Sequence, residues 1–214
     1  LALWQHLDTS EQPRNELVRH VIEHSVLAAH RHVFGVLAWF TVLAAFGLGP
    51  AGAVVYRTSE FVSRYWRHKN SIGNQPSSEA LQAAATSAWR VIDWLPARIT
   101  SLGFAVVGSF EEAIDSWRNH AQRFPDDNDG VIVAATAGAI NLRLGGDALR
   151  ALTPVQSLDG TDGDEAQSAT GSGTGTPGRE PEPAYLAQVV GLVWRSVVMW
   201  LVLLALLTLA RLLG

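Results

Sequence analysis

The sequence predicts a mainly α-helical, polytopic membrane protein with amphipathic and partly embedded helices. The first observation is the stretch 33–56, which contains no Asp, Glu, Lys, Arg or His over its 24 residues. The second is an apolar run over 189–210, whose single charged residue is Arg195. A helix rises about 1.5 Å per residue, so about 20 apolar residues cross a hydrocarbon core of about 30 Å. The third is that apolar residues between these runs recur at helical spacing.

Composition excludes several classes of function. The chain has 214 residues, a formal net charge of −4 and no cysteine. Disulfide bonds, thiolate catalysis and Cys-ligated metals are therefore excluded. The mildly acidic balance supplies no basic face, so we expect no nucleic-acid partner. Because the chain begins at Leu1 and not at Met, we expect it to lack an N-terminal part that holds further spans.

The residues over 16–32 predict an amphipathic helix that leads into the membrane. His20 and His24 have the i,i+4 spacing of metal ligands, but no HExxH motif and no carboxylate third ligand accompany them. We therefore expect no metal site and assign these histidines to the membrane entry. The stretch 33–56 contains Pro50 and three nearby glycines, which predict either one kinked span or a span with a re-entrant turn.

A cluster of basic and aromatic residues follows the apolar stretch, over 57–70. One interpretation is a positively charged flank with an aromatic belt, which places this side of the membrane in the cytoplasm. The other is a site for an anionic ligand, to which Arg57 and Lys69 contribute charge. The sequence of this segment is compatible with both.

Two further uncharged segments, 99–110 and 131–142, are too short to cross a bilayer, since 12 helical residues reach only about 18 Å. The first either enters the membrane partway or extends the helix that precedes it. Within that preceding helix, Pro96 is expected to cause a break or kink. The second is rich in Ala and Gly, which favours an intramembrane packing element.

The segment 156–183 consists mainly of Gly, Ser, Thr, Asp, Glu and Pro and predicts a disordered linker. Its GTGTPGRE stretch lacks the Lys-Ser/Thr pair of a phosphate-binding loop, so we expect no nucleotide site there. The linker separates a membrane region, 1–155, from a C-terminal transmembrane helix, 184–214. In that helix Arg195 either reaches the interface or pairs with a carboxylate in the bundle.

Four segments of the chain resemble, in the same order, segments of the CobD/CbiB cobalamin-biosynthesis membrane protein family. These are GPAGAVVYR at 49–57, WLPARIT at 94–100, the NDG, AGA and LRLGG elements within 128–146, and LVWR at 192–195. Together they cover most of the chain. The phrase HRHVFGV at 30–36 is most similar to a divergent proteobacterial branch of the family, which is related to the AmpE membrane proteins.

The resemblance implies a multi-pass protein of the bacterial inner (plasma) membrane. It implies an adenosylcobinamide-phosphate synthase, which joins adenosylcobyric acid and an aminoalcohol phosphate through an ATP-dependent amide bond. The implied cofactors are ATP and Mg²⁺, and the implied partners are membrane lipids, a corrinoid and an aminoalcohol phosphate. We expect a set of polar residues in or beside the family-like motifs to bind substrate phosphate on the cytoplasmic face. They are Arg57, Lys69, Arg98, Asn128 and Arg143. No catalytic residue is assigned.

Three positions depart from the family pattern. Glu60 and Ser63 stand where an ungapped alignment has Asn and Asp, and Val133 is apolar where the family often has Glu. If the family's polar residues bind metal or substrate, this protein is a non-catalytic relative. The alternative prediction is therefore an AmpE-like inner-membrane modulator of signalling, and a structural or unrelated membrane protein is a third.

Overall fold

The computed structural model describes residues 14–72, 79–146 and 175–213. In these ranges the chain is almost entirely helical, and Leu142 and Arg179 form an isolated parallel bridge. In chain order the elements are α2 (Arg14–Ala29), the π-helical turn η1 (His30–Phe34), α3 (Gly35–Ala44), α4 (Gly49–Ile72), α5 (Glu79–Val107), α6 (Phe110–His120), the 3₁₀ turn η2 (Ala121–Arg123), α7 (Asp127–Ile140) and α9 (Tyr185–Leu213).

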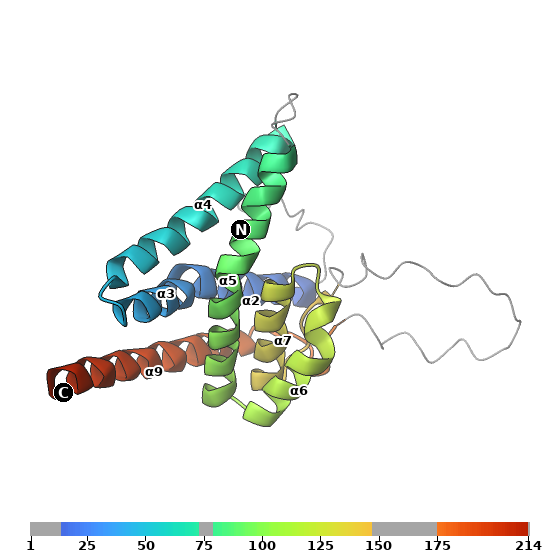
Figure 1. Cartoon of the computed structure of the whole chain (residues 1–214). Helices are drawn as coiled ribbons and strands as arrows, with labels where there is room; N and C mark the ends of the chain where they lie inside the picture. Colours follow the sequence, from blue (N-terminus) through green and yellow to red (C-terminus); the bar gives the residue numbers. More distant parts are fainter. Residues whose placement is uncertain (1–13, 73–78, 147–174, 214) are drawn as a thin grey trace, which may run out of the picture.

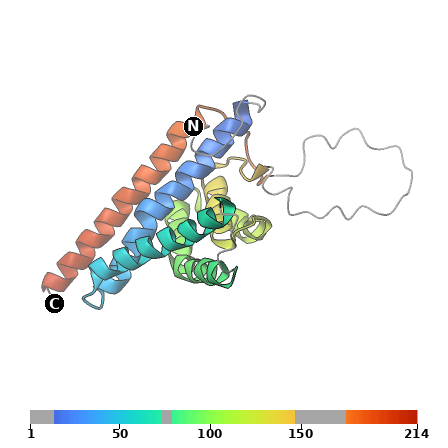
Figure 2. The ribbon, with the colours of Figure 1, turned by 90° about the horizontal axis from the view of Figure 1, so that it is seen from above.

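Two long apolar helices lie side by side. One is the continuous helix formed by α2, η1 and α3, and the other is α9, which runs in the same direction (Figures 1 and 2). The C-terminal ends of these two helices are in contact: Arg211 Nη2 donates a hydrogen bond to the Ala44 carbonyl at 2.7 Å. Arg14–Ala44 and Tyr185–Leu213 are each long and apolar enough to cross a membrane, judged by length and composition.

The expected single span over 33–56 is not one continuous helix. The helix that enters this stretch ends at Ala44, and α4 begins at Gly49 and turns back (Figure 1). Gly47 adopts a positive φ of 80°, a conformation that glycine tolerates and most residues do not. The Gly- and Pro-rich sequence therefore produces a reversal of direction and not a single kinked helix, which was one of the two expected forms.

Of the break or kink expected at Pro96, the break is excluded, because α5 continues through Pro96 to Val107. Proline cannot donate to the carbonyl four residues earlier, which here belongs to Ile92. The indole Nε1 of Trp39 donates to that carbonyl at 2.9 Å instead. A side chain from α3 thus satisfies the acceptor that the proline leaves free. The residues 99–107 supply the last turns of α5, and α6 begins at Phe110.

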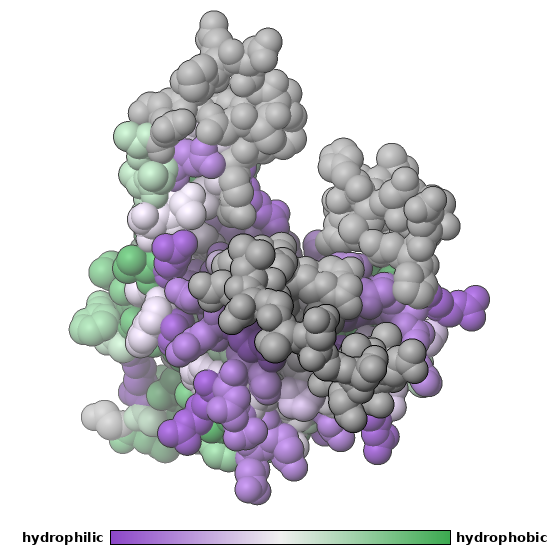
Figure 3. All heavy atoms as spheres, turned by 90° about the vertical axis from the view of Figure 1, so that its right-hand side faces the viewer, coloured by the Kyte–Doolittle hydropathy of each residue, from purple (hydrophilic) through white to green (hydrophobic). Residues whose placement is uncertain are grey.

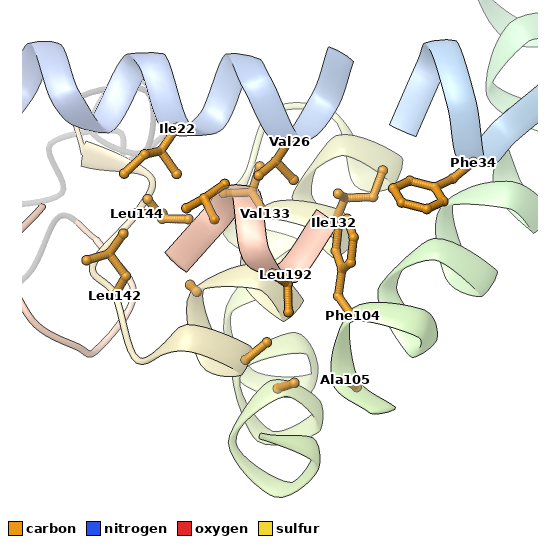
Figure 4. Close-up of a cluster of buried hydrophobic side chains, with 14 of the residues drawn as sticks. Ile22, Val26, Phe34, Phe104, Ala105, Ile132, Val133, Leu142, Leu144 and Leu192 are labelled. Atoms are coloured by element: carbon orange, nitrogen blue, oxygen red, sulfur yellow. The ribbon is translucent and has the colours of Figure 1, made fainter. Parts of the chain in front are cut away.

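The hydrophobic core surrounds α7, on which most side chains between Asn128 and Ala139 are buried. Figure 4 shows Ile132 and Val133 of this helix among residues from α2, α5 and α9, including Val26, Phe104 and Leu192. Small residues allow this close approach, since α7 packs against both α5 and α6. The Ala- and Gly-rich segment 131–142 therefore forms the centre of the helix packing.

Part of the predicted linker 156–183 is ordered. Thr176 is 1% exposed, and it exchanges two hydrogen bonds with Leu144: its backbone N–H donates at 2.8 Å, and its hydroxyl accepts at 2.9 Å. Arg179 accepts from the backbone N–H of Arg143 at 2.7 Å. This docking uses backbone groups and a hydroxyl, so the scarcity of apolar residues does not prevent it. The rest of the predicted linker, 156–174, lies outside the described residues.

Replacing Gly138 by alanine tests the packing of α7 against α6. A Cβ at Gly138 would collide with the Glu112 carbonyl and lie 2.6 Å from Ala113 Cα. Because backbone atoms form this contact, we expect the substitution to reduce the free energy of unfolding in detergent by about 1–3 kcal/mol. Gly191→Ala is the matched control, since nothing lies within 4 Å of its added Cβ. Equal stability of the two variants would contradict the packing described here.

Candidate functional site

Four polar side chains form a buried network where η1, α4 and α5 meet. His30 is central: its Nε2 lies 2.9 Å from Asp93 Oδ1 and its Nδ1 lies 2.9 Å from Thr100 Oγ1. The hydroxyl of Tyr56 donates to the same Asp93 oxygen at 2.8 Å. All four residues are at most 1% exposed. Because a carboxylate accepts both donors, the network assigns the imidazole proton to Nε2 and lets Nδ1 accept from the threonine hydroxyl. We call these residues the His30 network.

Charged pairs surround the His30 network. Arg31 Nη2 donates to Asp129 Oδ2, which connects η1 to α7. On α4, Arg57 pairs with Glu60 one turn later and also lies 2.9 Å from His32 Nδ1. Burial raises the pKa of the Asp129 carboxyl above its usual value, although the nearby Arg31 acts in the opposite direction. Arg31 and Arg57 are thus each paired with a carboxylate beside the His30 network.

Arg98 and Asn128 form a second polar centre between α5 and α7. Arg98 Nη1 donates to Asn128 Oδ1 at 2.8 Å, and Asn128 Nδ2 donates to the Arg90 carbonyl at 2.9 Å. The guanidinium also lies 4.3 Å from the ring centre of Trp94, within the range of a cation–π interaction. Asp126 caps α7 by accepting from the backbone N–H of Asn128 at 3.1 Å. These contacts fix the orientation of Arg98.

A pocket of about 710 Å³ opens beside this pair. Its lining comes from α5, α6, η2 and α7: Arg98, Trp117, Arg118, Ala121, Gln122, Asp127 and Val131. Partial burial lowers the pKa of Arg98, while Asp127 and Asp93 act against this shift. Since arginine stays protonated in proteins, Arg98 and Arg118 present two positive charges, an arrangement suited to an anionic group. Hydrophilic side chains dominate the face of the molecule seen in Figure 3, toward which α6 lies.

The structure brings together two of the five site residues predicted from the sequence, Arg98 and Asn128. Arg57 lies on α4 beside the His30 network and is not part of the pocket lining. Arg143 lies in the connection after α7, where its backbone pairs with the docked segment that contains Thr176. The side chain of Lys69 lies outside the described residues.

The sequence reasoning did not identify His30, Tyr56 or Asp93 as a unit. They come from three helices, and His30 and Asp93 are 63 positions apart. One signal is present in the sequence: Asp93 is an acidic residue in a helical segment that is rich in apolar residues.

Glu60 and Ser63, the two departures from the family pattern on α4, are both buried, at 4% and 2% exposure. Glu60 pairs with Arg57 and with Arg64, whose Nε lies 3.4 Å from it. Both positions therefore carry polar side chains that point into the helix packing. The third departure, Val133, contributes to the hydrophobic core.

The fold and the site define a class: a helical protein with two apolar helices long enough to cross a membrane and a polar centre enclosed between helices. The chain belongs to the CobD/Cbib protein family, whose model matches residues 5–172.

Two curated relatives carry the name cobalamin biosynthesis protein CobD. The protein from Stutzerimonas stutzeri (strain A1501) is 27% identical over 217 residues, which cover 95% of this chain and 63% of the relative. The protein from Chromobacterium violaceum is 32% identical over 141 residues, which cover 66% of this chain and 42% of the relative. The chain thus spans less than two thirds of the length of these relatives. No solved structure matches it.

Proposed function

We propose that this protein acts in cobalamin biosynthesis as an adenosylcobinamide-phosphate synthase. Family membership supports the pathway, and both relatives are named for it. The observation that supports a substrate-binding site is the pocket beside Arg98, whose guanidinium contacts Asn128 and Trp94. A rigidly held cation at a pocket wall suits substrates that bear phosphate groups.

The proposed reaction forms one amide bond and consumes one ATP. A carboxylate oxygen of adenosylcobyric acid attacks the terminal phosphorus of ATP, and ADP leaves. The amine of the aminoalcohol phosphate then attacks the acyl carbon, loses a proton, and inorganic phosphate leaves. Such steps depend mainly on positioning the reactants and on cations that offset phosphate charge.

The pocket supplies groups for those tasks. Arg98 and Arg118 offset negative charge, the amide of Gln122 can donate a hydrogen bond, and Trp117 provides an aromatic wall. Asp127, an exposed carboxylate on the lining, is the residue that would hold a Mg²⁺ ion brought in with nucleotide phosphates. Mg²⁺ is often bound through one or two carboxylates plus phosphate oxygens, and it would supply charge neutralisation. Within the described residues no group of three or more His, Cys, Asp or Glu could hold a metal ion.

The proposed location is the bacterial inner membrane, with more than one membrane-embedded segment. The two apolar helices support this placement, and on α9 most side chains of the C-terminal half are exposed. Hydrophilic side chains gather in the lower centre and at the right of the face that Figure 3 shows, which suits contact with water and with soluble substrates.

The second candidate is an AmpE-like signalling modulator without synthase activity. The observation that favours it is Glu60, which forms an ion pair with Arg57 at a position where the family pattern has a different polar residue. If that position binds metal or substrate in active relatives, the ion pair would prevent it.

Complementation separates the two candidates. We expect this protein, expressed in a bacterial strain that lacks its own synthase, to restore growth that depends on cobalamin synthesis from adenosylcobyric acid. The same strain supplied with cobinamide is the positive control, because cobinamide enters after the proposed step. Failure to grow without cobinamide, with the protein present in the membrane fraction, would contradict the synthase proposal and favour the modulator.

A further inference from the structure

The stretch 33–56 forms a helical hairpin whose two ends lie together. Tyr56 packs directly over Gly35, where any Cβ would collide with the tyrosine ring. Near the turn, Gly52 lies against the Trp39 carbonyl, and a Cβ there would collide with it. Glycines at these positions let α3 and α4 approach closely, as small residues do between membrane helices. The first and last residues of the uncharged stretch therefore lie close together in space.

Polar and charged side chains lie together at the two ends of the hairpin. We call His32, Arg57 and Glu60 the charged collar. Arg57 Nη1, just after the stretch, lies 2.9 Å from Nδ1 of His32, just before it, and 3.5 Å from the Arg31 carbonyl. Glu60 completes the collar through its pair with Arg57. Both ends of the hairpin are thus polar and joined to each other, while no residue between them is charged.

The tip of the hairpin is apolar and exposed. Phe46 is 76% exposed and Leu48 is 57% exposed, an arrangement that is costly in water. The N–H groups of the turn are nevertheless paired within the chain: each N–H from Ala45 to Leu48 donates to a carbonyl of the last turn of α3, at 2.8 to 3.3 Å. A turn inside hydrocarbon needs this, because lipid offers no hydrogen-bond partner.

The contact with helix α9 indicates how deep the tip of the hairpin lies in the bilayer. Arg211 near its C-terminal end bonds to Ala44 beside the tip, and Arg195 lies about 24 Å away along the helix at about 1.5 Å per residue. The helix between these arginines is uncharged, and with side chains that extend toward the interfaces it fits a hydrocarbon core of about 30 Å. The first arm of the hairpin is about 20 Å long from residue 33 to residue 46, which is most of that distance.

We infer that residues 33–56 form a re-entrant hairpin, which enters the bilayer and returns to the same side with lipid acyl chains as the partner of its exposed face. The N-terminal ends of α2 and α9 lie on the entry side together with the charged collar. Helix α9 crosses to the other side. The His30 network lies directly behind the collar, so the hairpin anchors the polar centre at the membrane surface.

Single cysteines test the inference, because the chain has none of its own. Ser25 on α2 precedes the hairpin in the sequence and Thr58 on α4 follows it, and both residues are exposed. In membrane vesicles of one orientation, we expect Ser25→Cys and Thr58→Cys to react with an impermeant maleimide from the same side, and Leu213→Cys to react from the opposite side. Labelling of Ser25→Cys and Thr58→Cys from opposite sides would overturn the re-entrant path. Labelling of Leu213→Cys from the Ser25 side would overturn the crossing by α9.

Phe46→Cys tests the partner of the tip. We expect it to react at least tenfold more slowly than Thr58→Cys when the impermeant reagent is present on both sides of the membrane, and to react with a membrane-permeant maleimide. Equal rates with the impermeant reagent would mean that the tip lies in water, which would overturn the inference. Efficient disulfide formation between two Phe46→Cys chains would identify a second copy as the partner in place of lipid. Size-exclusion chromatography in detergent confirms that each variant is folded.

Discussion

Replacing Asp93 by alanine is expected to reduce the free energy of unfolding by about 2–6 kcal/mol, which is about 1–3 kcal/mol for each of two buried donors left without an acceptor. Asp93 accepts hydrogen bonds from His30 at 2.9 Å and from Tyr56 at 2.8 Å, and all three side chains are at most 1% exposed. Its removal leaves two buried donors without an acceptor, in a site that water does not reach. Because the network joins η1, α4 and α5, we also expect the region around the hairpin to loosen. Thermal unfolding of the detergent-solubilised protein measures the change.

Asp115→Ala is the control for this prediction. Asp115 lies exposed on α6, where it accepts one hydrogen bond from Asn119 of the same helix. Its loss is expected to change stability by no more than about 0.5 kcal/mol. If Asp93→Ala unfolds at the same temperature as Asp115→Ala, the His30 network does not stabilise the fold in the way described here.

Replacing Arg98 by alanine is expected to lower kcat/KM for amide formation by about 10- to 100-fold. This range corresponds to the loss of one charge-assisted hydrogen bond of about 1.5–3 kcal/mol between the guanidinium and a phosphate oxygen. Stability should fall much less than for Asp93→Ala, because Arg98 is only half-buried and its partner Asn128 keeps the hydrogen bond to the Arg90 carbonyl. Steady-state assays at varied concentrations of the aminoalcohol phosphate and of ATP measure the effect.

Arg14→Ala provides the matched control, since Arg14 is an exposed arginine at the start of α2 and away from the pocket. Removing it changes the net charge equally, so a general electrostatic effect would appear in both variants. Activity of Arg98→Ala within twofold of that of Arg14→Ala would show that the pocket beside Arg98 does not bind the reacting phosphate groups.

The helical class and the positions of the main helices follow from the sequence, because hydrophobic length and periodicity depend on local residues. The path of the stretch 33–56 does not, since its length fits both a span and a hairpin. Only the contacts of Tyr56 with Gly35 and of Arg57 with His32 decide between them, and these are tertiary. The continuation of α5 through Pro96 also depends on a tertiary contact, because the Ile92 carbonyl, to which Pro96 cannot donate, accepts a hydrogen bond from Trp39 on another helix.

The candidate site was predictable in part. Arg98 and Asn128 were identified because both lie in family-like motifs, and the structure joins them directly. The His30 network was not identified, because its members are each unremarkable in their local sequence and become neighbours only when three helices pack. The composition around Thr176 predicts a disordered linker, because composition does not reveal pairing through backbone groups.

The central proposal is that this member of the CobD/Cbib family forms the amide bond of adenosylcobinamide phosphate. The most direct measurement uses membranes that contain the protein, incubated with adenosylcobyric acid, an aminoalcohol phosphate, ATP and Mg²⁺, and followed by mass spectrometry. We expect adenosylcobinamide phosphate to accumulate, with one ADP released per product, and omission of any one substrate to abolish it. Absence of product from membranes in which the protein is folded and abundant would contradict the claim.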